Sequence, residues 1–255
     1  MSNQTMKKDS FEAIDYKQPS NRHYFKRGMQ AGVPVAIGYI PIAIAFGLLA
    51  KASGIPDLVT ILMSLIIFAG ASQFIGVNLI MAGVMYWEII LTTFILNLRH
   101  FLMTASLSQR VSDTTSKKQL SLLSFGVTDE TFSVASVQEE KDLPAMYLIG
   151  LNTIAFSAWN LGTWIGVFFA AGLPQSVQNS MGIALYAMFI GLLVPSLKKA
   201  SPTVVIVIIA ITISSLIYWT EMIQLSDGWR VILSTVIAAG IGVAIFPEKE
   251  GESHD

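Results

Sequence analysis

Cysteine is absent from the 255 residues of this chain. Disulfide bonds, thiolate metal sites and cysteine redox chemistry are therefore excluded. Charged residues are also scarce: they make up 13% of the sequence, roughly half of the 25% that is usual in a soluble domain. So few charges cannot cover a water-facing surface, which excludes a soluble enzyme and a disordered chain.

The sequence also lacks the motifs of several enzyme and binding classes. It has no G-x-x-x-x-G-K-[ST] loop for nucleotide phosphates, so we do not expect it to hydrolyse ATP. Its three histidines, His23, His100 and His254, are too far apart in the sequence to indicate a zinc cluster. The net charge of −1 gives no indication of a nucleic-acid partner. We therefore predict no cofactor and no metal.

Long apolar segments without charges are what the sequence has instead. No lysine, arginine, aspartate or glutamate occurs in residues 28–50, 58–87 or 143–197, and about 20 apolar residues suffice for one helical crossing of a bilayer. We predict an all-α, polytopic integral membrane helix bundle with about six to eight hydrophobic segments, including broken or re-entrant helices. The expected segments are 28–50, 58–84, 85–107, 119–136, 143–171, 181–197, 201–219 and 231–246.

The predicted organisation has three parts. Residues 1–27 form a polar N-terminal segment, residues 28–247 a single transmembrane transport domain, and residues 248–255 an acidic tail. The first part lacks the apolar core of a signal peptide, so we expect it to be retained. The positive-inside rule then predicts a multi-pass protein of the plasma or inner membrane with both termini in the cytoplasm. The basic residues behind this orientation are Lys7, Lys8, Lys17, Arg22, Lys26, Arg27, Arg110, Lys117, Lys118, Lys198 and Lys199.

A broken helix is expected in the first apolar segment, which contains Pro34, Gly38 and Pro41. A proline removes a backbone hydrogen bond and kinks a helix. The N–H groups at the start of a half-helix, together with its dipole, suit a carboxylate ligand. Such interruptions are typical of the substrate sites of transporters.

Segment 58–84 predicts a second interruption, because small and polar residues occupy its centre at 69–73. If this segment crosses the membrane fully, the basic residues 110–118 fall outside the cell. If it enters and returns as a broken or re-entrant hairpin, every basic cluster falls inside. Segment 119–136 leaves the same two alternatives open.

Arg99 and His100 lie within the apolar segment 85–107. A charged residue at the centre of a membrane helix costs about 2.5 to 3.5 kcal/mol on insertion scales, so such residues tend to be functional. Arg99 could bind a carboxylate bidentately, either of a substrate or of Asp129 or Glu130. Alternatively, the segment ends just before Arg99, whose side chain then extends to the membrane interface. His100 could exchange protons or serve as a structural hydrogen-bonding group.

Asp129 and Glu130 predict a cation or proton site that neutralises an ammonium group or pairs with Arg99. The alternative is a solvated pair in a loop. Because neighbouring residues on a helix point about 100° apart, we expect only one of the two to face a given cavity. Glu88 and Glu221 stand beside tryptophans at segment edges, which indicates interfacial positions.

Four stretches of sequence then occur in order. They are Gly38-Tyr-Ile-Pro41 with the following Ala45-Phe46-Gly47, Phe68-Ala-Gly-Ala-Ser-Gln73-Phe74, Asn97-Leu-Arg99-His100, and Thr128-Asp129-Glu130. Together they resemble the AzlC/YgaZ family, the large subunits of branched-chain amino acid permeases and exporters, over about residues 25–245. The resemblance implies secondary transport of valine, leucine and isoleucine out of the cell, together with a small AzlD/YgaH-like membrane subunit.

We therefore predict a secondary transporter of branched-chain, or small neutral, amino acids that works outward and is coupled to protons. Its partners are the small subunit, the lipid bilayer and the amino acid. The expected substrate-binding residues are Pro41, Phe68, Gln73, Phe74, Asn97 and Arg99, and the expected proton-coupling residues are His100, Asp129 and Glu130. The alternatives are an intramembrane hydrolase with Ser72 or Ser106 beside His100, a transporter of another small polar solute, and a structural membrane scaffold.

Overall fold

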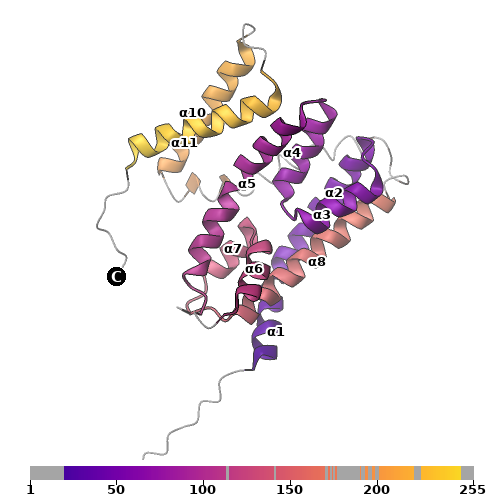
Figure 1. Cartoon of the computed structure of the whole chain (residues 1–255), viewed down its shortest axis with the longest axis vertical. Coiled ribbons are helices and arrows are strands. Elements are labelled where there is room, and N and C mark those ends of the chain that lie inside the picture. The colour runs from indigo at the N-terminus through magenta and orange to yellow at the C-terminus, as the bar shows by residue number, and fades with distance from the viewer. Residues whose placement is uncertain are drawn as a thin grey trace, which may run out of the picture.

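The computed structural model describes residues 20–112, 115–140, 142–169, 201–220 and 225–247, together with isolated residues between 170 and 200. These residues form ten helices and one isolated β-bridge, between Val111 and Leu143. Most of the predicted segment 181–197, most of the N-terminal segment and the acidic tail lie outside the described residues. The helices are α1 (Asn21–Ala31), α2 (Val33–Ala52), α3 (Asp57–Ile66), α4 (Gly70–Met81), α5 (Tyr86–Ser108), α6 (Lys117–Phe125), α7 (Asp129–Ser136), α8 (Ala145–Phe169), α10 (Ser201–Trp219) and α11 (Asp227–Ile245) (Figure 1).

Four of the described helices, α2, α5, α10 and α11, are long and apolar enough to cross a membrane. The predicted all-α class is therefore confirmed, whereas the number of crossings stays a prediction. With 25 residues α8 also has the length of a crossing. Three polar residues lie on it, Asn152, Asn160 and Thr163, and these residues are buried inside the protein.

The centre of the fold is a row formed by α1 and α2 on one side and α8 on the other (Figure 1). Glycines let the backbones touch. A methyl group at Gly28 would overlap the carbonyl oxygen of Tyr147, and one at Gly166 would overlap that of Ile44. Gly28 of α1 lies against Tyr147 near the start of α8, and Gly47 of α2 lies against Val167 near the end of α8. The two sides of the row therefore run in the same direction.

The break expected around Gly38 and Pro41 lies instead at Gly32, between α1 and α2. Pro34 occupies the first turn of α2, where its missing N–H costs nothing. The helix continues through Pro41, whose ring lies on the exposed side of α2. Ile37, whose carbonyl loses its helical partner to this proline, is on the same exposed side. The kink therefore supplies no free backbone groups to the interior.

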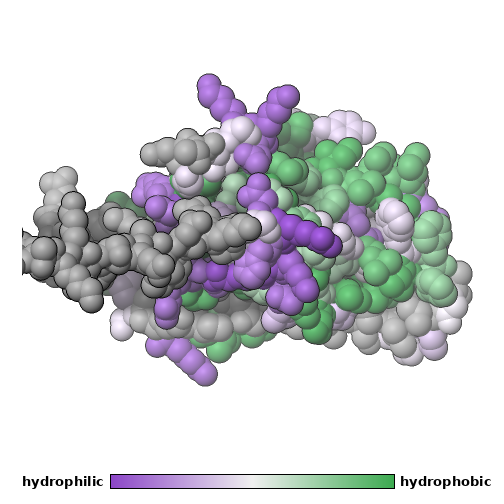
Figure 2. All heavy atoms as spheres, turned by 90° about the horizontal axis from the view of Figure 1, so that it is seen from below, coloured by the Kyte–Doolittle hydropathy of each residue, from purple (hydrophilic) through white to green (hydrophobic). Residues whose placement is uncertain are grey.

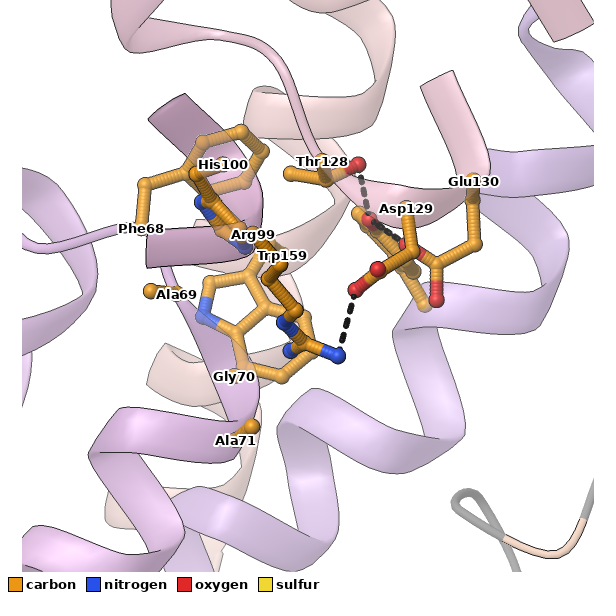
Figure 3. A pocket seen from close by; sticks show the side chains of 11 residues that line it. Phe68, Ala69, Gly70, Ala71, Arg99, His100, Thr128, Asp129, Glu130 and Trp159 are labelled. Carbon is orange, nitrogen blue, oxygen red and sulfur yellow. Dashed lines mark hydrogen bonds and ion pairs between the residues drawn. The ribbon is translucent and has the colours of Figure 1, made fainter. Parts of the chain in front are cut away.

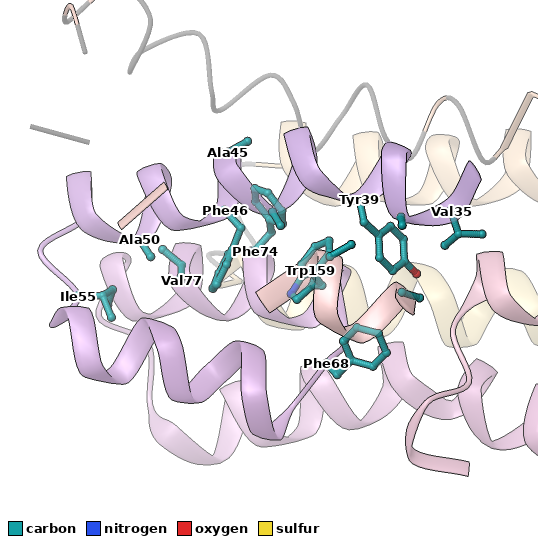
Figure 4. Close-up of a cluster of buried hydrophobic side chains, with 14 residues drawn as sticks. Val35, Tyr39, Ala45, Phe46, Ala50, Ile55, Phe68, Phe74, Val77 and Trp159 are labelled. Atoms are coloured by element: carbon teal, nitrogen blue, oxygen red, sulfur yellow. The ribbon is translucent and has the colours of Figure 1, made fainter. Parts of the chain in front are cut away.

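Segment 58–84 is a hairpin of two half-helices, α3 and α4. Residues 67–69 separate them, and Phe68 has a left-handed φ of 44°. The helices have 10 and 12 residues, so each reaches only about half of a 30 Å hydrocarbon core. In Figure 4, Ile55 just before α3 and Val77 near the end of α4 lie at one end of the buried cluster, and Phe68 lies toward the other. The chain therefore enters and returns at the same end, as the re-entrant alternative predicted.

Segment 119–136 forms a second hairpin, from the 9-residue α6 and the 8-residue α7. Residues 126–128 separate the two helices. The guanidinium of Arg110, at the end of α5, donates to the carbonyls of Ser136 and Gln138 just where α7 ends. Both ends of this hairpin therefore lie beside the end of α5. Because the α3–α4 hairpin enters beside the start of α5, the two hairpins enter the bundle from opposite ends.

The end of the molecule where α1 begins and α5 finishes is here called the basic end; the opposite one is the distal end. Arg27 of α1 forms an ion pair with Glu140 there, and this pairing lowers the pKa of the exposed Glu140 carboxyl. Arg110 and Lys117 lie at the same end. Figure 2 views the molecule from this side and shows hydrophilic side chains gathered on it, with hydrophobic ones beside them. The fold thus places Arg27, Arg110 and Lys117 at the same end of the molecule, as the sequence predicted.

Candidate functional site

A cavity lies where the tips of the two hairpins meet, at the level of the middle of α5. α2 and α8 close its remaining sides (Figure 3). Its lining consists of Tyr39, Phe68, Ala69, Gly70, Ala71, Arg99, His100, Thr128, Asp129, Glu130 and Trp159. The segments that supply these residues are far apart in the sequence, so only the fold brings them together.

The tip of the α3–α4 hairpin provides the apolar part of the lining. Ala69 is the N-cap of α4 and offers no side-chain hydrogen bond to the N–H groups of the first turn. These N–H groups and the positive end of the helix dipole therefore remain available for an anion at the cavity. Gly70 lies against the ring of Trp159, and a methyl group in its place would come within 2.7 Å of that ring. The small residues at this tip are thus needed for its packing against α8.

The tip of the α6–α7 hairpin provides the charged part. Thr128 caps α7: its hydroxyl accepts from the N–H of Thr131, and the hydroxyl of Thr131 accepts from the N–H of Thr128. Asp129 and Glu130 follow in the first turn of α7, where carboxylates are stabilised by the helix dipole. Both line the cavity, contrary to the expectation that only one would do so. The reason is that α7 points its end, rather than one side, at the cavity.

Arg99 lies across the cavity from this tip. One of its guanidinium nitrogens is 3.0 Å from Oδ2 of Asp129 (Figure 3). Since α5 continues to Ser108, Arg99 lies in mid-helix and not at a helix end. The Nε atom of Arg99 is buried and has no hydrogen-bond partner among the described residues. A guanidinium has five N–H donors, so Arg99 keeps donors for a further ligand.

Glu130 has a different partner from Asp129. The hydroxyl oxygen of Tyr39 lies 2.5 Å from Oε2 of Glu130 and 2.6 Å from Oγ1 of Thr128. A phenol has one hydrogen to donate. The other contact must therefore use a hydrogen from Thr128 or from a protonated Glu130. The charge of Asp129 is balanced by Arg99, whereas the partner of Glu130 is a neutral hydroxyl group.

His100 lines the cavity beside Phe68 (Figure 3). Neither serine considered for a hydrolase is paired with it among the described residues. The hydroxyl of Ser72 donates to Asn97 over 2.8 Å, and Ser106 is on the exposed side of α5. No group of three or more histidine, aspartate or glutamate side chains in the described part of the chain could hold a metal ion.

The other residues predicted for substrate binding lie outside the lining. Gln73 is completely buried and joins three helices: its side chain donates to Ser64 of α3 over 2.9 Å and accepts from Trp159 of α8 over 3.0 Å. Phe74 is buried against Phe46 of α2 (Figure 4). Asn97 faces Ser72, and Pro41 is exposed. In this conformation these residues support the hairpin α3–α4 and do not reach the cavity.

Two residues were passed over in the sequence. Tyr39 was not singled out, although a tyrosine in an apolar span needs a hydrogen-bond partner and so signals a polar neighbour. For Glu88 the sequence predicts an interfacial position but not its partner: it is only 5% exposed and accepts a hydrogen bond from Ser226, just before α11. No local pattern could have found this contact, because its two residues are 138 positions apart.

The cavity is small. It leaves about 20 Å³ for the centres of water-sized molecules, roughly the space of one water. An amino acid with a branched side chain is several times larger. Binding of such a molecule therefore requires the hairpin tips to move apart.

Comparison with known proteins shows which family this chain is similar to. The family model described as "AzlC protein" matches residues 34–173. The inner membrane protein YgaZ of Escherichia coli is 35% identical over 181 residues, which are 69% of this chain and 74% of that protein. An uncharacterized membrane protein of Archaeoglobus fulgidus is 33% identical over 68% of this chain and 76% of its own length. The branched-chain amino acid transport protein AzlC of Bacillus subtilis is 25% identical over 69% of this chain and 68% of its own. No solved structure matches.

Proposed function

This chain belongs to the AzlC family of membrane transport proteins, and we propose that it is the large subunit of a secondary transporter that moves branched-chain amino acids out of the cell. The observation that carries the proposal is the cavity between the two opposed hairpin tips, where Arg99 has unused donors. Half-helices that end near the middle of the membrane are typical of transporter sites. The Bacillus subtilis relative is named for branched-chain amino acid transport, which supports the same substrate class.

Arg99 and the uncapped start of α4 hold the carboxylate of the amino acid. Both offer N–H donors to the same cavity, and a planar guanidinium matches a carboxylate with two parallel hydrogen bonds. The incoming carboxylate replaces Asp129 as the partner of Arg99. Asp129 is then free to receive the ammonium group of the substrate. The exchange of partners keeps the charges in the cavity balanced.

The branched side chain lies against Phe68 and Trp159. Phe68 packs edge-to-face on Tyr39, as does Trp159, so the three rings form one apolar wall. The side chains of Ala69 and Ala71 add only methyl groups to the lining. An apolar wall without free polar groups favours aliphatic side chains over polar ones.

Glu130 carries the coupling proton, with His100 as a second group that can exchange it. Glu130 is bonded to the neutral hydroxyl group of Tyr39, so a proton can be added to it without breaking an ion pair. Asp129 lacks this freedom while it is paired with Arg99. Intramembrane carboxylates and histidines are the usual proton relays of transporters.

The basic end faces the cytoplasm, in agreement with the positive-inside rule. Relatives in the family are named inner membrane or membrane proteins, which supports the cell membrane as the location. A small AzlD/YgaH-like membrane subunit completes the transporter, as the family likeness implies. The apolar side chains that α5 exposes, including Phe94, Leu98 and Phe101, offer it a surface.

Efflux of labelled valine from preloaded cells tests this function. Cells that express the chain with the small subunit should export valine faster than control cells, and an imposed proton gradient should change the rate. Alanine, lysine and valinol serve as competitors, and valinol, which has no carboxylate, should not compete. Arg99→Gln should abolish efflux, while Glu139→Gln in an exposed loop should not change it. Equal efflux with and without the chain would reject the proposal.

A further inference from the structure

A second buried polar cluster lies at the distal end, between α5 and α11. It consists of Glu88, Thr92, Ser226 and Gly228 and is here called the α5–α11 cluster. Glu88 is in the first turn of α5 and only 5% exposed. Eleven residues separate it from Arg99, which corresponds to about 16 Å along a helix. The α5–α11 cluster is therefore separate from the cavity.

The start of α11 is built around the carboxylate of Glu88. Ser226 is the N-cap of α11, but its hydroxyl does not cap that helix. It donates to Oε1 of Glu88 instead. Gly228 allows this close approach, since a methyl group there would overlap Oε1 of Glu88 and lie 2.9 Å from Oγ1 of Thr92. Oε1 of Glu88 and Oγ1 of Thr92 thus both face Gly228 of α11.

Thr92 has a hydroxyl group without a partner. It is completely buried, and its Oγ1 atom has no hydrogen bond to any described residue. Buried hydroxyl groups are nearly always bonded, so this one indicates a partner that is present in another state. The nearest titratable group on the same face of α5 is Glu88, one helical turn earlier.

The charged residues around the α5–α11 cluster are already paired. Arg230 of α11 forms an ion pair with Asp227 over 2.6 Å, and its guanidinium also stacks on Tyr218 of α10. On the apolar side, Trp87 and Trp229 pack edge-to-face. Glu88 is therefore held by a hydroxyl group and a helix N-terminus, with no cation bonded to it in the described residues.

We propose that Glu88 is a second proton-binding group of the transporter, which takes up and releases the coupling proton at the distal end. The inference rests on the proposed function. In the ionised state, Glu88 accepts from Ser226. When a proton from water binds to the carboxylate, the new O–H donates to Oγ1 of Thr92, which fills the missing hydrogen bond. Release of the proton restores the first state, so each state has its own partner.

The position of Glu88 connects this proton to the cavity. Glu88, Thr92 and Arg99 are spaced by four and seven residues, and this spacing places them on one face of α5. Protonation of Glu88 removes the negative charge that faces the start of α11 and so weakens the contact between α11 and α5. The same helix that carries the substrate-binding arginine thus also carries the proton group that faces the distal end.

The decisive test separates exchange of substrate from net transport. Proteoliposomes that contain the full chain with the small subunit are loaded with valine. Exchange of internal for external labelled valine needs no net proton movement, whereas efflux driven by a proton gradient does. Glu88→Gln should keep exchange within about twofold of the wild type and lose at least tenfold in gradient-driven efflux. Glu139→Gln should keep both.

Thr92→Val provides a second variant with unchanged charge and nearly unchanged volume. It should lower gradient-driven efflux at least threefold and leave exchange intact. Gradient-driven efflux at the wild-type rate in Glu88→Gln would overturn the inference. Loss of exchange together with efflux in both variants would also overturn it, since Glu88 would then be a structural residue.

An infrared titration keeps the two hypotheses apart. The purified wild-type chain should show the carbonyl band of a protonated buried carboxyl group on acidification. Glu88→Gln should lose one component of this band, because Glu130 contributes another, and Thr92→Val should shift the same component. If the wild type exchanges no valine, the proposed function fails, but the band still decides about Glu88. A band that is unchanged in Glu88→Gln contradicts proton binding by Glu88.

Discussion

Each hairpin consists of two short helices and has a buried hydrogen bond to α8, but the two tips are held in different ways. The α3–α4 hairpin is fixed to α8 by a buried set of hydrogen bonds, in which Ser64 bonds to Thr163 over 2.7 Å and Gln73 bonds to Trp159. The α6–α7 hairpin is held at its tip by two carboxylates, which bond to Arg99 and to Tyr39. The first set of contacts lies away from the cavity, whereas the second lines it.

This difference suggests a division of roles. A substrate or a proton in the cavity competes directly for the partners of Asp129 and Glu130, but it does not reach the buried bonds of Gln73. We therefore expect the α6–α7 hairpin to move during transport and the α3–α4 hairpin to stay with α8. A ligand shifts a conformational equilibrium only through contacts that differ between the two states.

The largest expected effect comes from the charged tip. Asp129→Asn leaves Arg99 without its ion-pair partner and should reduce valine efflux about tenfold or more, since a hydrogen bond to a charged group contributes about 1.5 to 3 kcal/mol. Cell efflux assays with membrane levels checked by immunoblot measure this. Asp57→Asn is the matched control, because Asp57 pairs with Lys51 at the entrance of the other hairpin. If both variants lose efflux equally, the proposed division of roles is wrong.

The next effect concerns stability. Gln73→Leu leaves the indole N–H of Trp159 without an acceptor and removes a donor from Ser64. We expect a loss of about 1 to 3 kcal/mol, the usual cost of a buried unsatisfied group. Thermal unfolding of the purified chain in detergent measures it, with Gln109→Leu at the exposed end of α5 as control. A melting temperature equal to that of the wild type would show that this network does not hold the hairpin.

A smaller effect is expected at the apolar tip. Gly70→Ala places a methyl group 2.7 Å from the ring of Trp159 and should cost about 1 to 2 kcal/mol, in the lower part of the range for overpacking. Gly76→Ala in the same helix is the control, because only the end of a methionine side chain lies near its new methyl group, at 3.9 Å. The account predicts a lower melting temperature for the first variant alone; equal values would contradict the close contact.

The smallest effect separates two helix caps. Thr128→Val removes the cap of α7 and a partner of Tyr39, whereas Ser116→Ala removes the exposed cap of α6. Loss of a cap costs about 1 kcal/mol, so each variant should melt a little lower. Only Thr128→Val should also change valine efflux, because Thr128 lines the cavity. An efflux defect in Ser116→Ala of the same size would mean that any weakening of this hairpin impairs transport.

The sequence predicted much of the architecture because the bilayer constrains it strongly. The segments without charges predicted the apolar helices, and the positions of the basic clusters favoured a re-entrant hairpin for segment 58–84. The break predicted at Pro41 does not occur, because this proline lies on an exposed face of α2 and leaves no unpaired backbone group in the interior. The break of that segment lies at Gly32 instead. The interruption predicted within 58–84 is present, but its exact turn depends on Phe68 with positive φ, which is rare for such a residue.

The site was predictable to the extent that it consists of charges in apolar surroundings. Arg99, His100, Asp129 and Glu130 were found in this way, and so was the possible pairing of Arg99 with Asp129. Gln73 was misplaced because a glutamine in a span has the same signature whether it binds a ligand or other helices. The contact of Glu88 was not predictable because its partner, Ser226, is remote in the sequence. Long-range packing decides both cases.

Equilibrium binding of labelled valine to the purified full chain tests the central claim most directly, namely that Arg99 between the two hairpin tips holds the substrate carboxylate. The wild type should bind valine, and valinol should not displace it. Arg99→Gln should bind valine at least about tenfold more weakly, the loss expected when hydrogen bonds to a charged group are removed, while its melting temperature stays near that of Glu139→Gln. Wild-type affinity in a folded Arg99→Gln variant would contradict the account.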